Sequence, residues 1–210
     1  MKRTEYRDQK FAFPFVAYTP EKEQSGKLPL VIQLHGAGER GNGEDDLKLV
    51  DVHGFSKLFA KQDFDCITVM PQCPNDTFWA ARVESILRFV EQMKEEFDVD
   101  ESRIYLTGIS MGGFGTWFTA MAKPEIFAAI APVCGGGMPW NAAVFNMPIW
   151  VFHGMADTVV NPVYSDDMVT ALERIGAEVT YTRLEGVGHN AWDYTYDAEL
   201  MNWLLSKKRD

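Results

Sequence analysis

Cysteine is scarce in this sequence, and long apolar runs are missing. The chain has three cysteines in 210 residues, Cys66, Cys73 and Cys134, a number too small and too odd for a disulfide framework. Cys66 and Cys134 lie in apolar, strand-like segments, where cysteine is typical of a packed core. No segment approaches the roughly 18 consecutive apolar residues that indicate a membrane-spanning helix. We therefore expect a chain that folds around a hydrophobic core.

Basic residues are few relative to acidic ones. The chain has 20 Lys and Arg against 30 Asp and Glu, a formal net charge of −10. Such a chain repels phosphate backbones and anionic lipid surfaces, so we expect neither a nucleic-acid nor a membrane partner. Residues 1–11 are charged and lack the apolar stretch of a signal peptide, which favours a cytoplasmic protein if they are the native start. The oligomeric state is not indicated.

Patterns typical of metal sites are also missing. No Cys/His spacing resembles that of a zinc site. The acidic cluster 44–46 lacks the ligand spacing of a calcium-binding loop, so a solvated helix start is the simpler interpretation. We expect no metal and no other cofactor.

Apolar residues make up 46% of the chain, an ordinary share for a folded protein. No repeat or linker divides the chain, so we expect one domain over residues 1–210. Strand-like and helical segments alternate, which predicts an α/β fold with a mostly parallel sheet and helices on both faces. Pro14 suggests that the first predicted strand lies at a sheet edge. The predicted strands are 11–18, 30–34, 66–70, 103–107, 127–133, 148–152 and 178–184, and the predicted helices are 80–97, 111–122, 162–175 and 192–205.

The segment 108–112, GISMG, fits the pattern G-x-S-x-G between a predicted strand and a predicted helix. This is the context of a nucleophile elbow, a tight turn that exposes a serine. Glycines two residues before and after the serine remove Cβ atoms that would collide in such a turn. The pattern predicts Ser110 as a nucleophile and the backbone N–H of Met111 as a donor to a developing oxyanion.

A serine nucleophile needs a base, and His189 is the best candidate among four histidines. It follows the last predicted strand and therefore lies at the same sheet edge as Ser110. His35 and His153 each stand at a strand end, where structural hydrogen bonding is the simpler interpretation. His53 shows no functional signal.

The base needs an acid that fixes its tautomer. Asp157 follows the strand 148–152, and the order serine, aspartate, histidine is the one typical of α/β-hydrolases. Asp166 and Asp167 fall in the first turns of a predicted helix, and Asp193 is expected to begin the last one. These three are therefore the weaker candidates.

A second oxyanion donor is expected in the segment 34–41, LHGAGERG, which follows a central strand. Its glycines let the backbone approach a substrate carbonyl. We choose the N–H of Ala37 as the donor, with that of Gly38 as the alternative. The simpler interpretation is that the segment is only a flexible turn.

Five segments together resemble the α/β-hydrolase superfamily: HGAGERG, PQCP followed by Trp79, GISMGG, HGMAD and GVGHNAW. The resemblance runs from about residue 30 to 205. It is strongest for compact serine esterases and predicted peptidases, the group of feruloyl and acetyl-xylan esterases and of polyhydroxybutyrate-depolymerase-like and dienelactone-hydrolase-like enzymes. It implies the roles already assigned to Ser110, Asp157 and His189, with Ala37 and Met111 as oxyanion donors.

The connection 134–147 is too short to fold into a cap domain, so we expect an open site. Aromatic and sulfur side chains near strand ends or triad positions are candidate substrate contacts, although each could instead be packing: Trp79, Met138, Trp140 and Trp192. The expected enzyme is a serine carboxylesterase for small esters with short acyl or aryl-acyl groups, such as acetyl or feruloyl groups on sugars. A serine peptidase with the same triad and an inactive hydrolase-fold binding domain are the alternatives.

Overall fold

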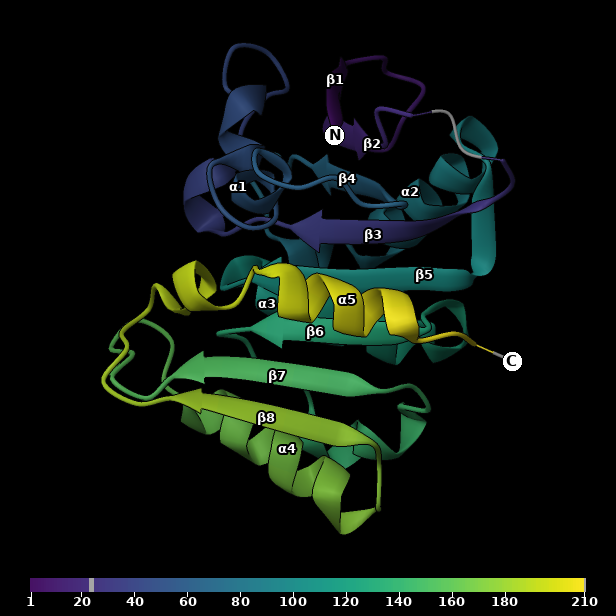
Figure 1. The fold of residues 1–210 in the computed structure, drawn as a ribbon. Helices are drawn as coiled ribbons and strands as arrows, with labels where there is room; N and C mark the ends of the chain where they lie inside the picture. The colour runs from purple at the N-terminus through teal and green to yellow at the C-terminus, as the bar shows by residue number, and fades with distance from the viewer. Residues whose placement is uncertain (23–24, 210) are drawn as a thin grey trace.

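The computed structural model describes residues 1–22 and 25–209. Figure 1 shows a twisted central sheet with helices in front of it and behind it. The strands are β1 (Lys2–Tyr6), β2 (Phe15–Thr19), β3 (Leu28–Leu34), β4 (Ile67–Pro71), β5 (Val99–Ile109), β6 (Ala129–Val133), β7 (Ile149–Gly154) and β8 (Val179–Leu184). The α-helices are α1 (Ser56–Phe59), α2 (Val83–Glu96), α3 (Met111–Ala122), α4 (Val163–Arg174) and α5 (Ala198–Ser206).

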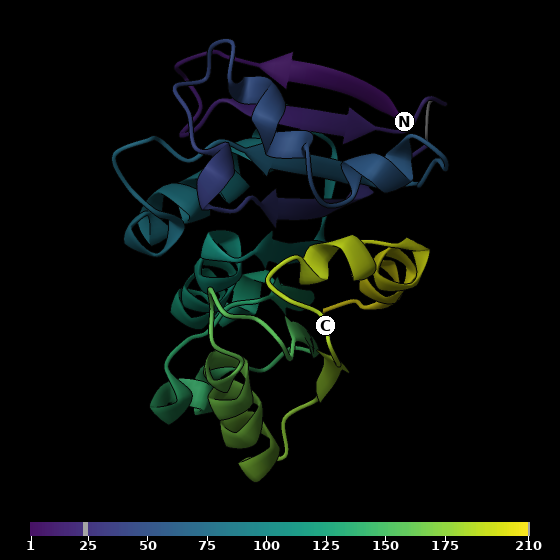
Figure 2. The same cartoon turned by 90° about the vertical axis from the view of Figure 1, so that its left-hand side faces the viewer.

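The sheet is mostly parallel, as predicted. Its strand order is β1-β2-β4-β3-β5-β6-β7-β8. The pairs β1–β2 and β2–β4 are antiparallel, and the five other pairs are parallel. The carboxyl ends of the parallel strands therefore meet at one edge of the sheet, on the left in Figure 1, and Figure 2 looks onto this edge.

Helices cover both faces of the sheet, because the buried strand residues alternate between two apolar clusters. Ile32 and Leu34 of β3 belong to the cluster that also contains side chains of α2, α3 and α4. Val31, between them, belongs to the cluster with side chains of α1 and α5. A strand buried on both faces in this way is typical of a covered parallel sheet. Figure 2 shows the two helical layers on opposite sides of the sheet.

The N-terminal part of the sheet differs from the prediction. β1 is a polar strand that the sequence pattern did not predict, and it forms the edge. β2 lies between β1 and β4, so the prediction of an edge position for the first apolar strand is wrong. Pro14 immediately precedes β2, where its missing N–H removes no ladder hydrogen bond.

The last predicted helix is divided in two. A 3₁₀ turn, η6 (Ala191–Tyr194), comes first, and α5 begins after Asp197. The Asp197 carboxylate accepts a hydrogen bond from the Leu200 N–H at 3.0 Å, which satisfies a free donor of the first helical turn and starts a new helix. Among the described residues, no helix combines the length and apolar character needed to cross a lipid bilayer.

Candidate active site

Ser110 occupies the sharp turn between β5 and α3. Its backbone has φ 54° and ψ −113°, a conformation that is unfavourable for any residue with a side chain. Hydrogen bonds hold it there: the Ser110 N–H donates to the Val133 carbonyl at 2.9 Å, and the Phe114 N–H donates to the Ser110 carbonyl at 3.1 Å. The turn leaves the hydroxyl half-exposed at the carboxyl edge of the sheet.

The two glycines around Ser110 are required by close backbone contacts. A Cβ atom on Gly108 would collide with the carbonyl oxygen of Gly112. A Cβ atom on Gly112 would collide with the carbonyl oxygen of Leu34 and lie 2.8 Å from that of His35. Because these neighbours are backbone atoms where α3 packs against the end of β3, they have little freedom to move.

We expect Gly112→Ala to lower the free energy of unfolding by about 2–4 kcal/mol, because the new methyl group overpacks the contact with β3. Gly38→Ala is the matched control, since a Cβ atom there meets nothing within 4 Å, and we expect a change within about 0.5 kcal/mol. Urea unfolding of both variants measures the difference. Equal stabilities would show that the first turn of α3 does not need a glycine.

The structure brings Ser110, His189 and Asp157 together at the ends of β5, β8 and β7. Nε2 of His189 lies 2.9 Å from Ser110 Oγ, and Nδ1 lies 2.7 Å from Asp157 Oδ2. A carboxylate only accepts, so Nδ1 carries the ring proton and Nε2 is left to accept the hydroxyl proton of Ser110. This is the arrangement that a general base for a serine nucleophile requires.

Asp157 is held in place by three hydrogen-bond donors. Besides His189, the backbone N–H groups of Val159 and Val160 donate to its Oδ1 at 2.8 and 2.9 Å. Burial raises the pKa of Asp157, but the hydrogen bonds from His189, Val160 and Val159 outweigh it and hold the pKa below the usual range. The carboxylate therefore stays ionised and keeps His189 oriented.

The alternative acids are engaged elsewhere. Asp193 forms an ion pair with Lys57, with 3.2 Å between Oδ1 and Nζ, and Asp166 pairs with Arg183 at 3.0 Å. Asp167 lies on α4 beside Asp166 and is exposed. The structure therefore places Asp157, and none of these three, against the histidine.

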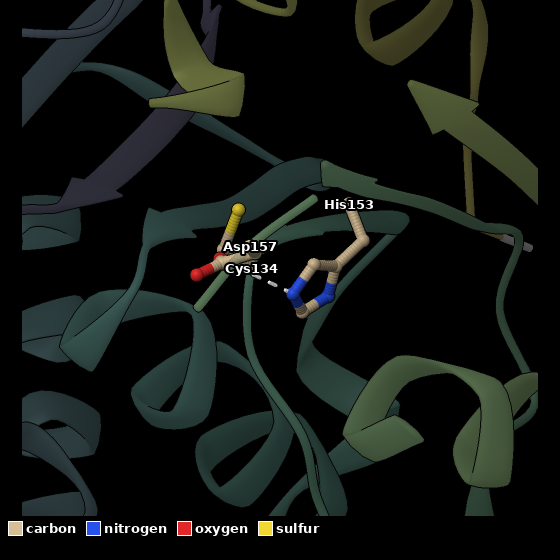
Figure 3. A group of neighbouring side chains, drawn as sticks. All are labelled: Cys134, His153 and Asp157. Atoms are coloured by element: carbon tan, nitrogen blue, oxygen red, sulfur yellow. Dashed lines mark ion pairs between the residues drawn. The ribbon is translucent and has the colours of Figure 1, made fainter. Parts of the chain in front are cut away.

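Cys134 and His153 lie beside Asp157, and Figure 3 shows the three side chains together. Their potential ligand atoms lie within 4.8 Å of one another. His153 Nε2 is 2.9 Å from the Val160 carbonyl and Nδ1 is 2.7 Å from Ser165 Oγ. Burial raises the pKa of the Cys134 thiol to about 12, so the thiol remains protonated. These groups are already used inside the protein, so they do not fit a metal ion.

His35 has a structural role in the loop 35–41, which follows β3. It donates from Nδ1 to the Gly36 carbonyl at 2.6 Å and accepts at Nε2 from the Cys73 N–H at 2.9 Å. Its carbonyl accepts from the indole N–H of Trp79 at 3.0 Å. Trp79 is fully buried, so the prediction that it contacts substrate is wrong. Its position after a strand end predicted that it lines the substrate site, but its ring packs in the core against Phe13.

Each of the two predicted oxyanion donors is the first residue of a helical segment. Ala37 opens the 3₁₀ turn η1 (Ala37–Glu39), and Met111 opens α3. The first N–H groups of a helix have no partner within it, so both are free to point at a ligand. A Cβ atom on Gly36 would lie 3.9 Å from Ser110 Cβ, which puts the loop beside the nucleophile. The donor roles of Ala37 and Met111 remain predictions.

The other candidate substrate contacts lie in two places. The Trp192 ring stands 5.1 Å from the His189 ring. Trp140 is 83% exposed on η5 (Pro139–Val144) and lines a surface groove with Tyr164 of α4. Met138 is half-buried immediately before η5. Substrate contact by these three residues remains a prediction.

His53, for which the sequence predicts no functional role, lies beside Trp192 of the candidate site. Its Nε2 lies 3.9 Å from Glu39 Oε1, and its ring stands 5.4 Å from that of Trp192. His53 belongs to an irregular segment without a motif, so no local signal could have placed it beside residues from η1 and η6.

The comparison with protein families finds one matching model, BD-FAE, over residues 17–128. This range covers more than half of the chain. It includes Ala37 and Ser110 and ends before Asp157 and His189.

Two curated relatives are, by name, an esterase and a depolymerase. A bifunctional acetylxylan esterase/xylanase of Neocallimastix patriciarum is 31% identical over 139 residues, which are 63% of this chain. A poly(3-hydroxyalkanoate) depolymerase C of Paucimonas lemoignei is 30% identical over 128 residues, which are 55% of this chain. The chain spans only 20% and 29% of the length of these two relatives.

Among solved structures, a thermostable esterase superposes on 99% of the chain with a TM-score of 0.83 and 32% identity. The chain covers 63% of that structure. The whole described sheet and its helical layers therefore have a counterpart in a solved esterase.

Proposed function

The chain belongs to the BD-FAE family, and we propose that it is a serine carboxylesterase with Ser110 as its nucleophile. The predicted α/β-hydrolase fold is confirmed by the superposition on a solved esterase. The observation that carries the proposal is the continuous hydrogen-bond chain from Asp157 through His189 to Ser110. It ends on a strained turn that presents the hydroxyl at the sheet edge.

The proposed reaction has two halves. Ser110 Oγ attacks the ester carbonyl while His189 Nε2 takes its proton, and Asp157 stabilises the resulting imidazolium. The N–H groups of Ala37 and Met111 hold the oxyanion of the tetrahedral intermediate. His189 then protonates the leaving alkoxide, which gives an acyl-enzyme on Ser110. A water molecule, deprotonated by His189, attacks the acyl carbonyl. The second tetrahedral intermediate then breaks its bond to Ser110 Oγ, which takes the proton back from His189 as the acid leaves.

The proposed substrates are small esters with short acyl or aryl-acyl groups, such as acetyl or feruloyl esters, including those on sugars. The connection between β6 and β7 holds only the short turn η5, so, within the described residues, this connection offers no cap to shield an alkyl chain from water. Each CH₂ group of the acyl chain that stays exposed to water loses about 0.8 kcal/mol of binding free energy that burial would supply. The name of one curated relative, the acetylxylan esterase/xylanase, supports acetyl esters on sugars.

We expect acetyl, butyryl and feruloyl esters to be hydrolysed with a much higher kcat/KM than a palmitoyl ester or a peptide amide. Amides are harder because the leaving amine must be protonated in place. A side-by-side measurement of kcat/KM on these substrates tests the preference. Highest activity on the palmitoyl ester would contradict the open-site proposal, and highest activity on the amide would favour the peptidase.

Covalent labelling tests the nucleophile independently of the substrate. A fluorophosphonate probe should label Ser110 in the folded protein, because it reacts with serines activated by a base. A folded protein that is not labelled would favour the inactive binding domain instead.

A further inference from the structure

Glu39 is the last residue of η1, the turn that Ala37 begins. Its side chain is only 16% exposed. Glu39 Oε2 comes within 3.0 Å of the position that a Cβ atom on Gly36 would occupy, and Ser110 Cβ comes within 3.9 Å of the same position. The carboxylate and the nucleophile therefore border the same small space beside Gly36.

The neighbouring arginine does not neutralise this carboxylate. Arg40 donates from Nε to the Ala37 carbonyl at 3.0 Å and from a terminal nitrogen to the Thr77 carbonyl at 3.3 Å. Within the described ranges 1–22 and 25–209, the ion-pair contacts of Glu39 are with two histidines, His35 and His53, each at 3.9 Å. That distance is too long for a hydrogen bond.

His35 cannot supply the missing positive charge. Its Nδ1–H donates to the Gly36 carbonyl, and its Nε2 accepts from the Cys73 N–H. This pattern fixes the neutral ring, and burial lowers the pKa of His35 to about 4. His53 is the one remaining counter-group in the described part of the chain, and it is not hydrogen-bonded to the carboxylate. Glu39 thus keeps free acceptor positions next to the reacting serine.

We propose that Glu39 is a specificity-determining residue that rejects esters carrying a negative charge close to the scissile bond. The inference rests on the proposed function. A carboxylate in a partly buried site repels a like charge much more strongly than one in bulk water. Hydroxyl groups near the ester, by contrast, can donate a hydrogen bond to the Glu39 carboxylate. The site would therefore favour neutral, hydroxyl-bearing esters over anionic ones.

Two pairs of esters test the proposal on the two sides of the scissile bond. On the alcohol side, 4-acetylphenyl acetate, which has a single ester bond, is compared with 4-acetoxybenzoate. On the acyl side, phenyl hexanoate is compared with monophenyl adipate. For each pair, kcat/KM for the neutral ester is divided by kcat/KM for the anionic ester. This ratio is measured for the wild type and for Glu39→Gln. Comparing ratios between variants cancels the intrinsic reactivity of the esters.

We expect Glu39→Gln to lower this ratio roughly ten-fold in at least one pair. The control is Glu44→Gln, which makes the same change in net charge at a side chain that is 79% exposed and 3.8 Å from Arg7; its ratios should match the wild type. Unchanged ratios in Glu39→Gln, or equal shifts in both variants, would overturn the proposal. If the wild type hydrolysed neither neutral ester, the proposed function would fail, and this inference with it.

Discussion

Ser110→Ala is expected to lower kcat by about 10⁶ while the protein remains folded. The variant loses the atom proposed to form the acyl-enzyme, and His189 has no other hydroxyl within reach of its Nε2 among the contacts of the described residues. Alanine and serine tolerate the φ of 54° at this turn about equally, so the strain is unchanged. Residual activity should come from the oxyanion donors alone.

Steady-state hydrolysis of a short-chain aryl ester and urea unfolding measure the two halves of this prediction. The free energy of unfolding should stay within about 0.5 kcal/mol of the wild type, because the hydroxyl is half-exposed. Near-normal turnover by the alanine variant would remove the central claim about the nucleophile. A variant that fails to fold would show that the hydroxyl supports the turn.

Asp157→Asn is expected to lower kcat by roughly 10⁴. The N–H groups of Val159 and Val160 would still donate to the remaining amide oxygen, so the side chain keeps its place. Its NH₂ group would then face His189 Nδ1 and donate to it. The ring proton would shift to Nε2, and His189 could no longer accept the proton of Ser110.

Asp193→Asn is the matched control for this variant. It makes the same chemical change near the base in sequence, but Asp193 faces Lys57 and not the His189 ring. Its kcat should stay within a few-fold of the wild type. A severe loss in Asp193→Asn together with a mild one in Asp157→Asn would show that the acid has been assigned to the wrong residue.

The turn at Ser110 could be predicted from the sequence because the steric constraints that define it are local. A serine between two glycines, after an apolar strand and before a helical stripe, has one geometry that avoids the collisions at Gly108 and Gly112. The mostly parallel sheet also follows from local patterns, since alternating strands and helices build a parallel sheet whose carboxyl ends share an edge. Residues directly after those strands were therefore expected to meet.

Side-chain positions at the walls of the site were decided by the tertiary structure. Trp79 follows a strand end, as a substrate contact would, yet the packing of α3 and β3 encloses it completely. β1 adds to the sheet through backbone pairing, for which its polar side chains carry no signal.

The sequence by itself determined which residues are proposed to carry the chemistry of this protein, because Ser110, Asp157 and His189 each stand in a motif tied to a strand end. The tertiary structure alone decided what surrounds them. Glu39 and His53 come from segments without any shared periodicity, and they face each other only because η1 and the chain before α1 pack over the same sheet edge. Burial and charge at such a place depend on neighbours distant in sequence, which no local pattern encodes.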